Sequence, residues 1–177
     1  MAVRSDMGLI SFWYYTDLFE ASWSLGMPAH INFLNDSKKS PQKNTMKGMF
    51  CGGAKLETQR QLEFEERFKV PVFTNYGLTE TTSFASCALA DTSKNVPGSV
   101  GRPLSINEIR IVKGVSSINS GEIGEIHIKG RNVFKEYLNK PEITKERFLD
   151  GWFHTGDLGY MDEEDNLFIL DRIDNMI

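Results

Sequence analysis

The first half of the chain alternates short apolar runs with longer amphipathic segments. Two apolar runs, 46–53 and 70–77, each end at a glycine, which is typical of buried strands that feed a turn. Between them, residues 56–68 place Leu and Phe side chains among charged ones at helical spacing, which predicts a helix. Before the first run, Pro28 predicts the start of another helix that continues through Leu34. This alternation of strand and helix predicts part of a parallel α/β sheet.

The pattern changes near residue 91, where a segment rich in Gly, Pro and Ser begins. After it, runs of alternating apolar and polar residues are separated by turn residues, and one helix is expected over 140–149. We therefore expect an α/β protein with a partial parallel α/β subdomain at 1–95 and a small antiparallel β-rich subdomain, a distorted barrel, at 96–177. The strands expected in the second subdomain are 108–112, 124–130, 151–156 and 166–170.

Composition supports a folded core and argues against some partners. Of the 177 residues, 40% are hydrophobic, so a disordered chain is not expected. The net charge of −4, with no basic stripe in the sequence, gives no support for nucleic-acid binding. The N-terminal apolar run is shorter than the about 18 residues that a spanning helix needs, and no signal-peptide cleavage site follows it, so we expect a cytoplasmic protein with no transmembrane segment.

The cysteines and the N-terminal aromatic residues each allow two interpretations. Cys51 and Cys87 are expected to be buried free thiols, with a single disulfide as the alternative. The aromatic segment 7–27 is expected to pack in the core. If the chain is a fragment, part of that segment and an unpaired sheet edge would be exposed and would promote self-association.

Candidate chemistry begins at the glycines that follow the first apolar run. Gly52 and Gly53 lie where ligands bind in α/β proteins, beyond the carboxyl ends of strands. Glycine lets the backbone approach a flat or phosphorylated ligand closely. The same pair also suits a tight strand-to-helix turn that binds nothing, so this motif alone is weak.

The stretch "NYGLTE" at 75–80 follows the next expected strand and opens onto the same edge. Tyr76 offers a ring face for stacking, and Thr79 offers a hydroxyl group to a phosphate oxygen. Glu80 is a hard oxygen ligand of the kind that Mg²⁺ prefers. The alternative for Glu80 is an acid that only stabilises a helix N-terminus.

A third stretch, "HTGDLG" at 154–159, places Asp157 between glycines after another expected strand. A carboxylate in this position can accept hydrogen bonds from both hydroxyls of a ribose, and the alternative is an Asp that caps its own turn. A hairpin that turns at 162–166 would bring Arg172 beside Asp157. Together, Tyr76, Thr79, Glu80 and Asp157 have the chemistry of a nucleotide site.

These motifs resemble those of the adenylate-forming enzymes, which include acyl-CoA synthetases, peptide-synthetase adenylation domains and beetle luciferase. The similarity covers most of residues 46–177 and, less closely, 26–34. The matching pieces, in the family's order, are "GGAKL", "YGLTE", "GSVGRPL", "GEIGEIHIKG" and "GWFHTGDLGYMDEEDNLFILDRIDNMI".

The resemblance implies a two-step ligase reaction. A carboxylate attacks the α-phosphate of Mg·ATP to give an acyl-adenylate and pyrophosphate, and a thiol, usually that of coenzyme A, then accepts the acyl group. The ending "DNMI" favours the acid–CoA ligase (AMP-forming) branch, although Asp171 stands where glycine is usual. A fragment of a peptide-synthetase adenylation domain is the alternative.

The resemblance also assigns roles to individual residues after the strands. The implied roles are contact with the adenine of ATP or AMP for Gly52, Gly53, Ala54, Asn75 and Tyr76; contact with the acyl chain around Gly77; contact with the α-phosphate for Thr79; Mg²⁺ binding for Glu80; ribose binding for Asp157 with support from Arg172; and an interdomain hinge at Asp174.

The family's phosphate loop is expected upstream of residue 1, and its lysine-bearing C-terminal domain is expected after residue 177. The chain is therefore expected to be a fragment of a ligase that uses ATP, Mg²⁺, coenzyme A and a carboxylic acid. We expect the isolated chain to be catalytically incompetent. The competing hypothesis is a natural, truncated nucleotide-binding or interaction module without catalysis.

Overall fold

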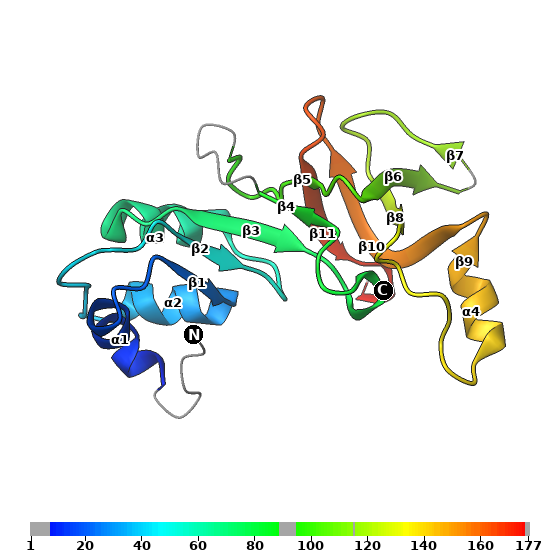
Figure 1. Cartoon of the computed structure of the whole chain (residues 1–177). Helices are drawn as coiled ribbons and strands as arrows, with labels where there is room; N and C mark the ends of the chain where they lie inside the picture. The colour runs from blue at the N-terminus through cyan, green and yellow to red at the C-terminus, as the bar shows by residue number, and fades with distance from the viewer. Residues whose placement is uncertain (1–7, 89–94, 115, 176–177) are drawn as a thin grey trace. The chain divides into compact units, whose positions relative to one another are not determined.

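The computed structural model describes residues 8–88, 95–114 and 116–175. The chain divides into two compact units, Met1–Thr74 and Asn75–Ile177 (Figure 1). The segment near residue 91, where the sequence pattern changes, belongs to the second unit, and its residues 89–94 lie outside the described part of the chain.

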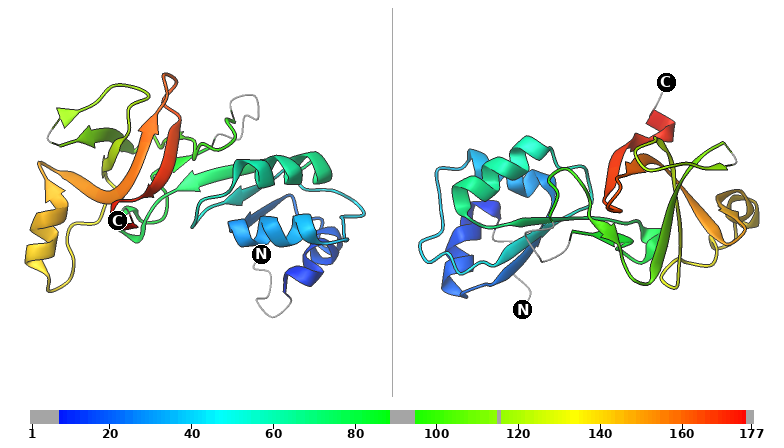
Figure 2. Two further views of the ribbon diagram at one scale, coloured as in Figure 1. Left: turned by 180° about the vertical axis from the view of Figure 1, so that it is seen from behind. Right: turned by 90° about the horizontal axis from the view of Figure 1, so that it is seen from above.

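The first unit is a parallel sheet with crossover helices. β1 (Trp23–Gly26) pairs with β2 (Gly48–Cys51), and β2 pairs with the beginning of β3 (Val72–Tyr76). α2 (Pro28–Asp36) and α3 (Thr58–Phe68) connect these strands, as the parallel pairing requires (Figures 1 and 2). The predicted alternation of strand and helix is thus confirmed. Within the described residues before β1 lie two short helices, η2 (Leu9–Ser11) and α1 (Phe12–Leu18).

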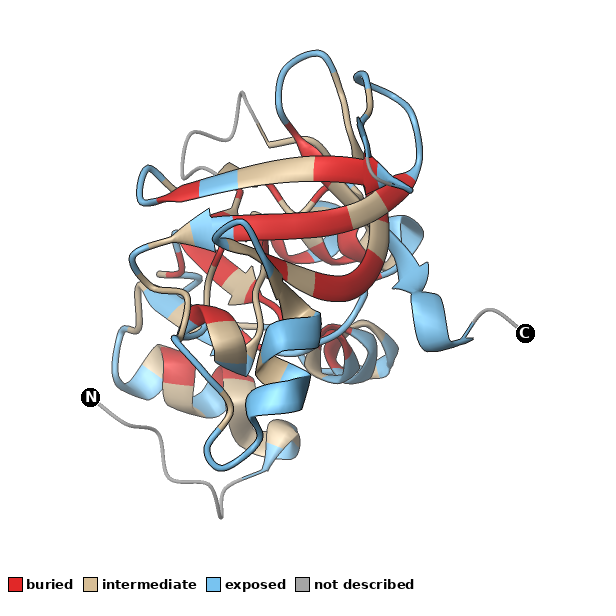
Figure 3. Cartoon of the chain, turned by 90° about the vertical axis from the view of Figure 1, so that its right-hand side faces the viewer, coloured by how far each residue is buried: buried red, intermediate tan, exposed pale blue. Residues whose placement is uncertain are grey.

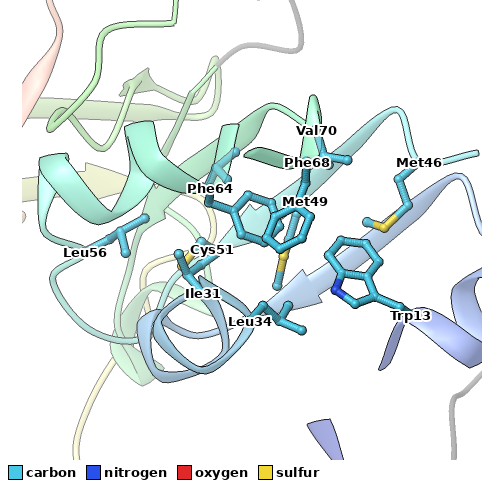
Figure 4. Close-up of a cluster of buried hydrophobic side chains, with 11 residues drawn as sticks. Trp13, Ile31, Leu34, Met46, Met49, Cys51, Leu56, Phe64, Phe68 and Val70 are labelled. Atoms are coloured by element: carbon cyan, nitrogen blue, oxygen red, sulfur yellow. The ribbon is translucent and has the colours of Figure 1, made fainter. Parts of the chain in front are cut away.

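The helices of this unit cover one face of the sheet. Met49 and Cys51 point from β2 into a core that also contains Ile31 of α2 and Phe64 of α3 (Figure 4). Trp13 of α1 joins the same core, with its ring centroid 4.6 Å from that of Phe68. Burial of such large side chains is the main favourable term in folding, so this core stabilises the first unit.

The aromatic residues near the N-terminus are divided between core and surface. Trp13 is buried, whereas Tyr14 and Phe19 are exposed. The predicted core packing is therefore confirmed for Trp13 and wrong for Tyr14, Phe19 and Trp23. A short helix and the segment that follows it cannot turn all of their aromatic side chains to the same core. On the sheet face away from the helices, Trp23 stacks on Phe50 with ring centroids 5.5 Å apart.

The second unit contains an antiparallel sheet whose strand order is β11-β10-β8-β6-β7, with β9 paired to β10. Its buried residues follow the long strands, whereas α4 is mostly exposed (Figure 3). The expected antiparallel strands are confirmed. The strand pairings of the described residues form an open path from β11 to β7, so the expected barrel is not closed among them. The elements are β6 (Asn107–Lys113), β7 (Ser116–Ser117), β8 (Gly124–Gly130), α4 (Pro141–Arg147), β9 (Phe148–Leu149), β10 (Trp152–Met161), β11 (Leu167–Arg172) and η5 (Ile173–Asn175).

The end of β3 continues into this second unit. Asn75 and Tyr76 pair with β4 (Ser86–Cys87), and β4 pairs with β5 (Arg102–Pro103), both antiparallel. The turn between β3 and β4 contains η3 (Thr79–Thr81). β3 is therefore parallel to its neighbour at its beginning and antiparallel at its end.

The helix expected over 140–149 is shorter than predicted. α4 ends at Arg147, and Phe148 begins β9. The Phe148 ring packs on that of Phe153 with centroids 5.3 Å apart. This packing and the β9–β10 pairing keep the last two residues extended, and the helical pattern of the sequence does not reveal such long-range contacts.

Two further expectations concern the cysteines and the membrane. Neither Cys51 nor Cys87 forms a disulfide among the described residues; Cys51 is buried as expected, whereas Cys87 is only partly buried. Burial raises the pKa of the Cys51 thiol to about 11. A buried thiol of this kind is a poor nucleophile, so it is a packing residue. Among the described residues, no helix has the length and apolar character needed to cross a bilayer.

Candidate functional site

The end of β3 and the middle of β10 meet through polar side chains. The Tyr76 hydroxyl donates a hydrogen bond of 2.5 Å to Asp157 Oδ2. Arg172 Nε lies 3.6 Å from the other carboxylate oxygen of Asp157. The β10–β11 pairing sets Arg172 directly opposite Asp157, which confirms the juxtaposition predicted from a hairpin at 162–166.

The Asp157 carboxylate is buried and charged groups surround it. Its residue is 5% exposed. Burial raises the pKa of Asp157, and this effect outweighs the opposing hydrogen bond from Tyr76 and the positive charge of Arg172. Burial and the nearby carboxylate also raise the pKa of the Tyr76 phenol, so Tyr76 remains a hydrogen-bond donor. A partly desolvated carboxylate of this kind gains most when a ligand supplies further donors.

Backbone contacts fix the orientation of Asp157. Thr155 Oγ1 donates to the carbonyl oxygen of Ile126 at 2.7 Å and accepts from the Asp157 N–H at 3.0 Å. The N–H of Gly156 donates to Glu125 Oε1 at 3.0 Å. Gly156 has a φ of 72°, a backbone conformation that favours glycine. Glycine at this position therefore allows the turn between Thr155 and Asp157.

Glu80 is held by a segment more than fifty residues away in the sequence. The Phe134 N–H donates to the Glu80 carbonyl oxygen at 2.8 Å, and the Tyr137 hydroxyl donates to Glu80 Oε1 at 2.8 Å. Asn132 Nδ2 donates to the carbonyl oxygens of Thr81 and Phe84, each at 2.8 Å. The segment 132–137 therefore fixes both the backbone and the side chain of the Glu80 turn.

Tyr137 is a residue that the sequence analysis missed. Burial, followed by the hydrogen bond to Glu80, raises the pKa of Tyr137 to about 12, so it stays a donor to the carboxylate. The second oxygen of Glu80 has no hydrogen-bond donor among the described residues, which leaves it free to bind a cation. No local sequence signal predicts this pair, because the contact arises only when the two segments fold together.

Glu80 and Arg172 line one cavity of about 270 Å³. The cavity also receives cationic side chains from the turn before α4 and from its last residue. Thr155, next to the Gly156–Asp157 turn, also lines it. The complete lining is Leu78, Glu80, Tyr137, Lys140, Ile143, Arg147, Phe153, Thr155 and Arg172.

The remaining predicted residues are divided between the two units. In the first unit, Gly53 and Ala54 form an exposed turn directly after β2, with Gly52 buried beside it, and Gly53 has a φ of 83°. In the second unit, Asn75 is buried, whereas Thr79 is exposed at the start of η3. Gly77 lies so close to the Ser83 carbonyl that an added Cβ would clash with it, and Asp174 is exposed in η5.

Glu125, His127 and His154 have ligand atoms within 4.8 Å of one another, which makes them candidate metal ligands. However, the His127 and His154 rings are stacked with centroids 3.9 Å apart and planes inclined by 12°. Lone pairs that lie in nearly parallel planes do not converge on one ion. Arg110, directly opposite His127 across β6 and β8, adds a positive charge that opposes a cation. We therefore assign Glu125 a structural contact with Gly156.

The cluster around Asp157 fits the polar part of a nucleotide. The buried carboxylate can accept hydrogen bonds from vicinal hydroxyls, and Arg172 supplies a positive charge beside it. A free Glu80 oxygen and several cations in the adjoining cavity suit phosphate groups and Mg²⁺. The arrangement can therefore bind a sugar hydroxyl pair and a metal–phosphate group side by side.

Comparison with known proteins relates this chain to one enzyme family. The profile described as "AMP-binding enzyme" matches residues 11–138. The chain is similar to 2-succinylbenzoate–CoA ligases from Bacillus licheniformis, at 41% identity over 116 residues, and from a Geobacillus strain, at 38% identity over 133 residues. These matches cover 66% and 75% of this chain but 24% and 27% of the relatives, so the chain spans about a quarter of their length.

Solved structures give the same relationship. The O-succinylbenzoate coenzyme A synthetase (MenE) from Bacillus subtilis, in complex with AMP, matches with a TM-score of 0.85 and 30% identity over 97% of this chain and 35% of its own. The same protein has been solved with ATP and a magnesium ion. ATP-bound MatB from Rhodopseudomonas palustris matches with a TM-score of 0.89 and 30% identity, over 97% of this chain and 34% of its own.

Proposed function

The chain belongs to the AMP-binding enzyme family, and on that premise we propose that it is part of an ATP-dependent acid–CoA ligase. Such an enzyme activates a carboxylic acid as an acyl-adenylate and then transfers the acyl group to coenzyme A. The observation that carries the proposal is the hydrogen bond between Tyr76 and the buried Asp157, with Arg172 beside it and Glu80 at the adjoining cavity. The relatives from Bacillus licheniformis and Geobacillus are both named as 2-succinylbenzoate–CoA ligases.

Asp157 is proposed to bind both hydroxyls of the ribose. Tyr76 holds the carboxylate through its hydroxyl, and its ring, which packs against the core of the second unit, is proposed to contact the adenine. Arg172 balances the charge of Asp157 and orients it. In this role the protein positions the α-phosphate for attack, which is the main contribution that such enzymes make to phosphoryl chemistry.

Glu80 is proposed to hold Mg²⁺ through the oxygen that Tyr137 leaves free. When bound, Mg²⁺ neutralises negative charge on the phosphates as the carboxylate approaches. Thr79, exposed at the start of the same turn, is proposed to donate its hydroxyl to the α-phosphate. The hydrogen bonds from Phe134 and Tyr137 keep Glu80 in place without help from the ligand.

The other roles in the proposal rest on the family relationship. Gly52, Gly53, Ala54 and Asn75 would contact the adenine, and residues around Gly77 the acyl chain. Asp174 would act as a hinge for a further domain. Because the chain spans about a quarter of its curated relatives, we assign the complete reaction to a protein of their length and expect the chain alone to bind nucleotides weakly.

A chimera tests this proposal, because it supplies the parts of the relatives that this chain does not cover. The matching segment of the Bacillus licheniformis ligase is replaced by this chain, and pyrophosphate release is measured with ATP, Mg²⁺ and 2-succinylbenzoate. We expect activity that falls at least 100-fold when Glu80→Gln or Asp157→Asn is introduced. A folded, active chimera that neither substitution affects would contradict the proposal.

The competing candidate function is a non-catalytic nucleotide-binding module that uses the same Asp157 site. In that case the isolated chain would bind AMP through Asp157, whereas the folded chimera would release no pyrophosphate. The two functions therefore predict the same binding result and opposite catalytic results.

Self-association is also proposed, because β1 is an edge strand of the first unit and carries exposed apolar side chains, among them Leu25. Light scattering at increasing concentration tests it. We expect a rise in mass that Leu25→Lys reduces, and a constant monomer mass would contradict the expectation.

A further inference from the structure

We propose that Arg147 and Lys140, together with Arg172, form an anion site in the cavity beside Glu80, and that its ligand is a diphosphate such as pyrophosphate. This inference rests on the proposed function, since it names the residues that would hold the leaving group of adenylate formation. Neither the motifs nor the family resemblance in the sequence pointed to Arg147 or Lys140.

The two arginines approach the same point of the backbone. A Cβ placed at Gly156 would lie 3.0 Å from Arg147 Nη1 and 3.5 Å from Arg172 Nη2. Both arginines line the cavity, and Lys140 lines it from the turn before α4. Three cations thus gather around a space next to the Asp157 turn.

These charges are only partly compensated within the described residues. Arg172 pairs with Asp157, and Glu80 is the acid that lines the cavity itself. Neither Arg147 nor the Lys140 ammonium group has an ion pair among the described residues. Like charges at close range repel one another, and a bound anion converts this repulsion into attraction.

The helix that carries Arg147 suggests a simpler role, which the geometry does not support. A cation in the last turn of a helix is favourable because of the helix dipole. α4 has two such cations, Lys145 and Arg147. Lys145 is exposed, as a solvated cation would be, whereas Arg147 is half-buried and faces the cavity.

The size and chemistry of the cavity indicate the class of anion. Guanidinium groups bind phosphate oxygens through paired N–H donors, and an ammonium group adds a compact charge. The volume of about 270 Å³ lies below the about 300–1,000 Å³ typical of pockets for drug-sized ligands. A small, multiply charged anion fits this space better than a whole nucleotide.

The proposed reaction produces such an anion. The carboxylate oxygen of the acid forms a bond to the α-phosphorus, and the bond from that phosphorus to the bridging oxygen breaks. The electron pair leaves with the bridging oxygen, so pyrophosphate departs with its full negative charge. Arg147 and Lys140 are placed to hold this charge, with Glu80 on the same cavity wall.

Titration calorimetry of the 177-residue chain with inorganic pyrophosphate and Mg²⁺ tests the proposal. We expect saturable binding that weakens at least tenfold in Arg147→Gln and less in Arg147→Lys. Lys145→Gln is the matched control, since it removes the same charge from the same helix, and we expect a change below twofold. Circular dichroism verifies the fold, and Lys140→Gln replaces Arg147→Gln if that variant does not fold.

Absence of pyrophosphate binding, or an equal loss in Arg147→Gln and Lys145→Gln, would overturn the anion site. A parallel titration with AMP separates this result from the proposed function. Binding of AMP without pyrophosphate refutes the anion site alone. Binding of pyrophosphate that depends on Arg147, without AMP binding, supports the anion site and refutes the nucleotide function.

Discussion

Tyr76 and Asp157 are 81 residues apart in the sequence, yet the phenol of one donates a 2.5 Å hydrogen bond to the carboxylate of the other. This bond ties the end of β3 to β10 within the second unit. It also keeps a buried acid partly compensated before any ligand is present.

Asp157→Asn is expected to remove a pH-dependent loss of stability. Burial raises the pKa of Asp157 above its ordinary value of 3.8, so the unfolded chain releases this proton more readily than the folded chain. The wild-type chain therefore loses stability as the pH rises from 3.8 through the raised folded pKa. Urea unfolding at several pH values measures the unfolding free energy of both proteins. We expect the unfolding free energy of Asp157→Asn to rise relative to that of the wild type as the pH increases over this range. A difference independent of pH would contradict the expectation.

His154→Gln is expected to act in the opposite pH direction. Burial, followed by the neighbouring His127, lowers the pKa of His154 below its ordinary value of 6.5. The unfolded chain then binds this proton first, so the wild type loses stability as the pH falls from 6.5 through the lowered folded pKa, by at most about 1.4 kcal/mol per pH unit. We expect the variant to lose less stability over this window, and a parallel decline in both proteins would be inconsistent with the account.

Tyr137→Phe is expected to weaken metal binding at Glu80. The hydroxyl fixes the carboxylate at 2.8 Å, and loss of such an orienting hydrogen bond reduces metal affinity by about tenfold or more. Titration of Mn²⁺, a stand-in for Mg²⁺, followed by electron paramagnetic resonance in the presence of ATP measures this affinity. Tyr160→Phe is a matched control, because Tyr160 stacks on Phe168 away from the cavity lining. Equal affinities in the two variants would show that Tyr137 does not position Glu80.

Gly101→Ala is expected to destabilise the second unit strongly. Gly101 has a φ of 77°, and an added Cβ would lie 1.9 Å from the Cys87 carbonyl carbon, so the backbone of β4 would have to move. We expect a loss of about 3 kcal/mol or more in unfolding free energy. Gly121 also has a positive φ, 81°, but an added Cβ there would have no atom within 4 Å. The variant Gly121→Ala therefore measures the backbone strain alone, which is about 1–3 kcal/mol. Equal losses in the two variants would contradict the close-contact argument.

The sequence predicted those features that depend on local pattern. Runs that end in glycine gave β2 and β3, alternation gave the long antiparallel strands, and the turn at 162–166 placed Arg172 opposite Asp157. These predictions succeeded because hydrophobic periodicity and turn residues act over a few residues.

The features that the sequence did not predict depend on long-range contacts. Tyr137 reaches Glu80 across 57 residues, and Arg147 reaches the Gly156 turn from the end of α4. The two-residue strands β4, β5, β7 and β9 are too short to show alternation and exist because their neighbours pair with them. Only the folded chain reveals which polar side chains share one cavity.

The central claim is that Asp157 binds the ribose of an adenine nucleotide, and a titration of the chain with AMP tests it most directly. Backbone amide shifts followed by nuclear magnetic resonance would report both affinity and location. We predict saturable shifts centred on residues 155–158 and Arg172, with an affinity that falls at least tenfold in Asp157→Asn. Shifts that are absent, that lie elsewhere, or that persist unchanged in Asp157→Asn would contradict the account.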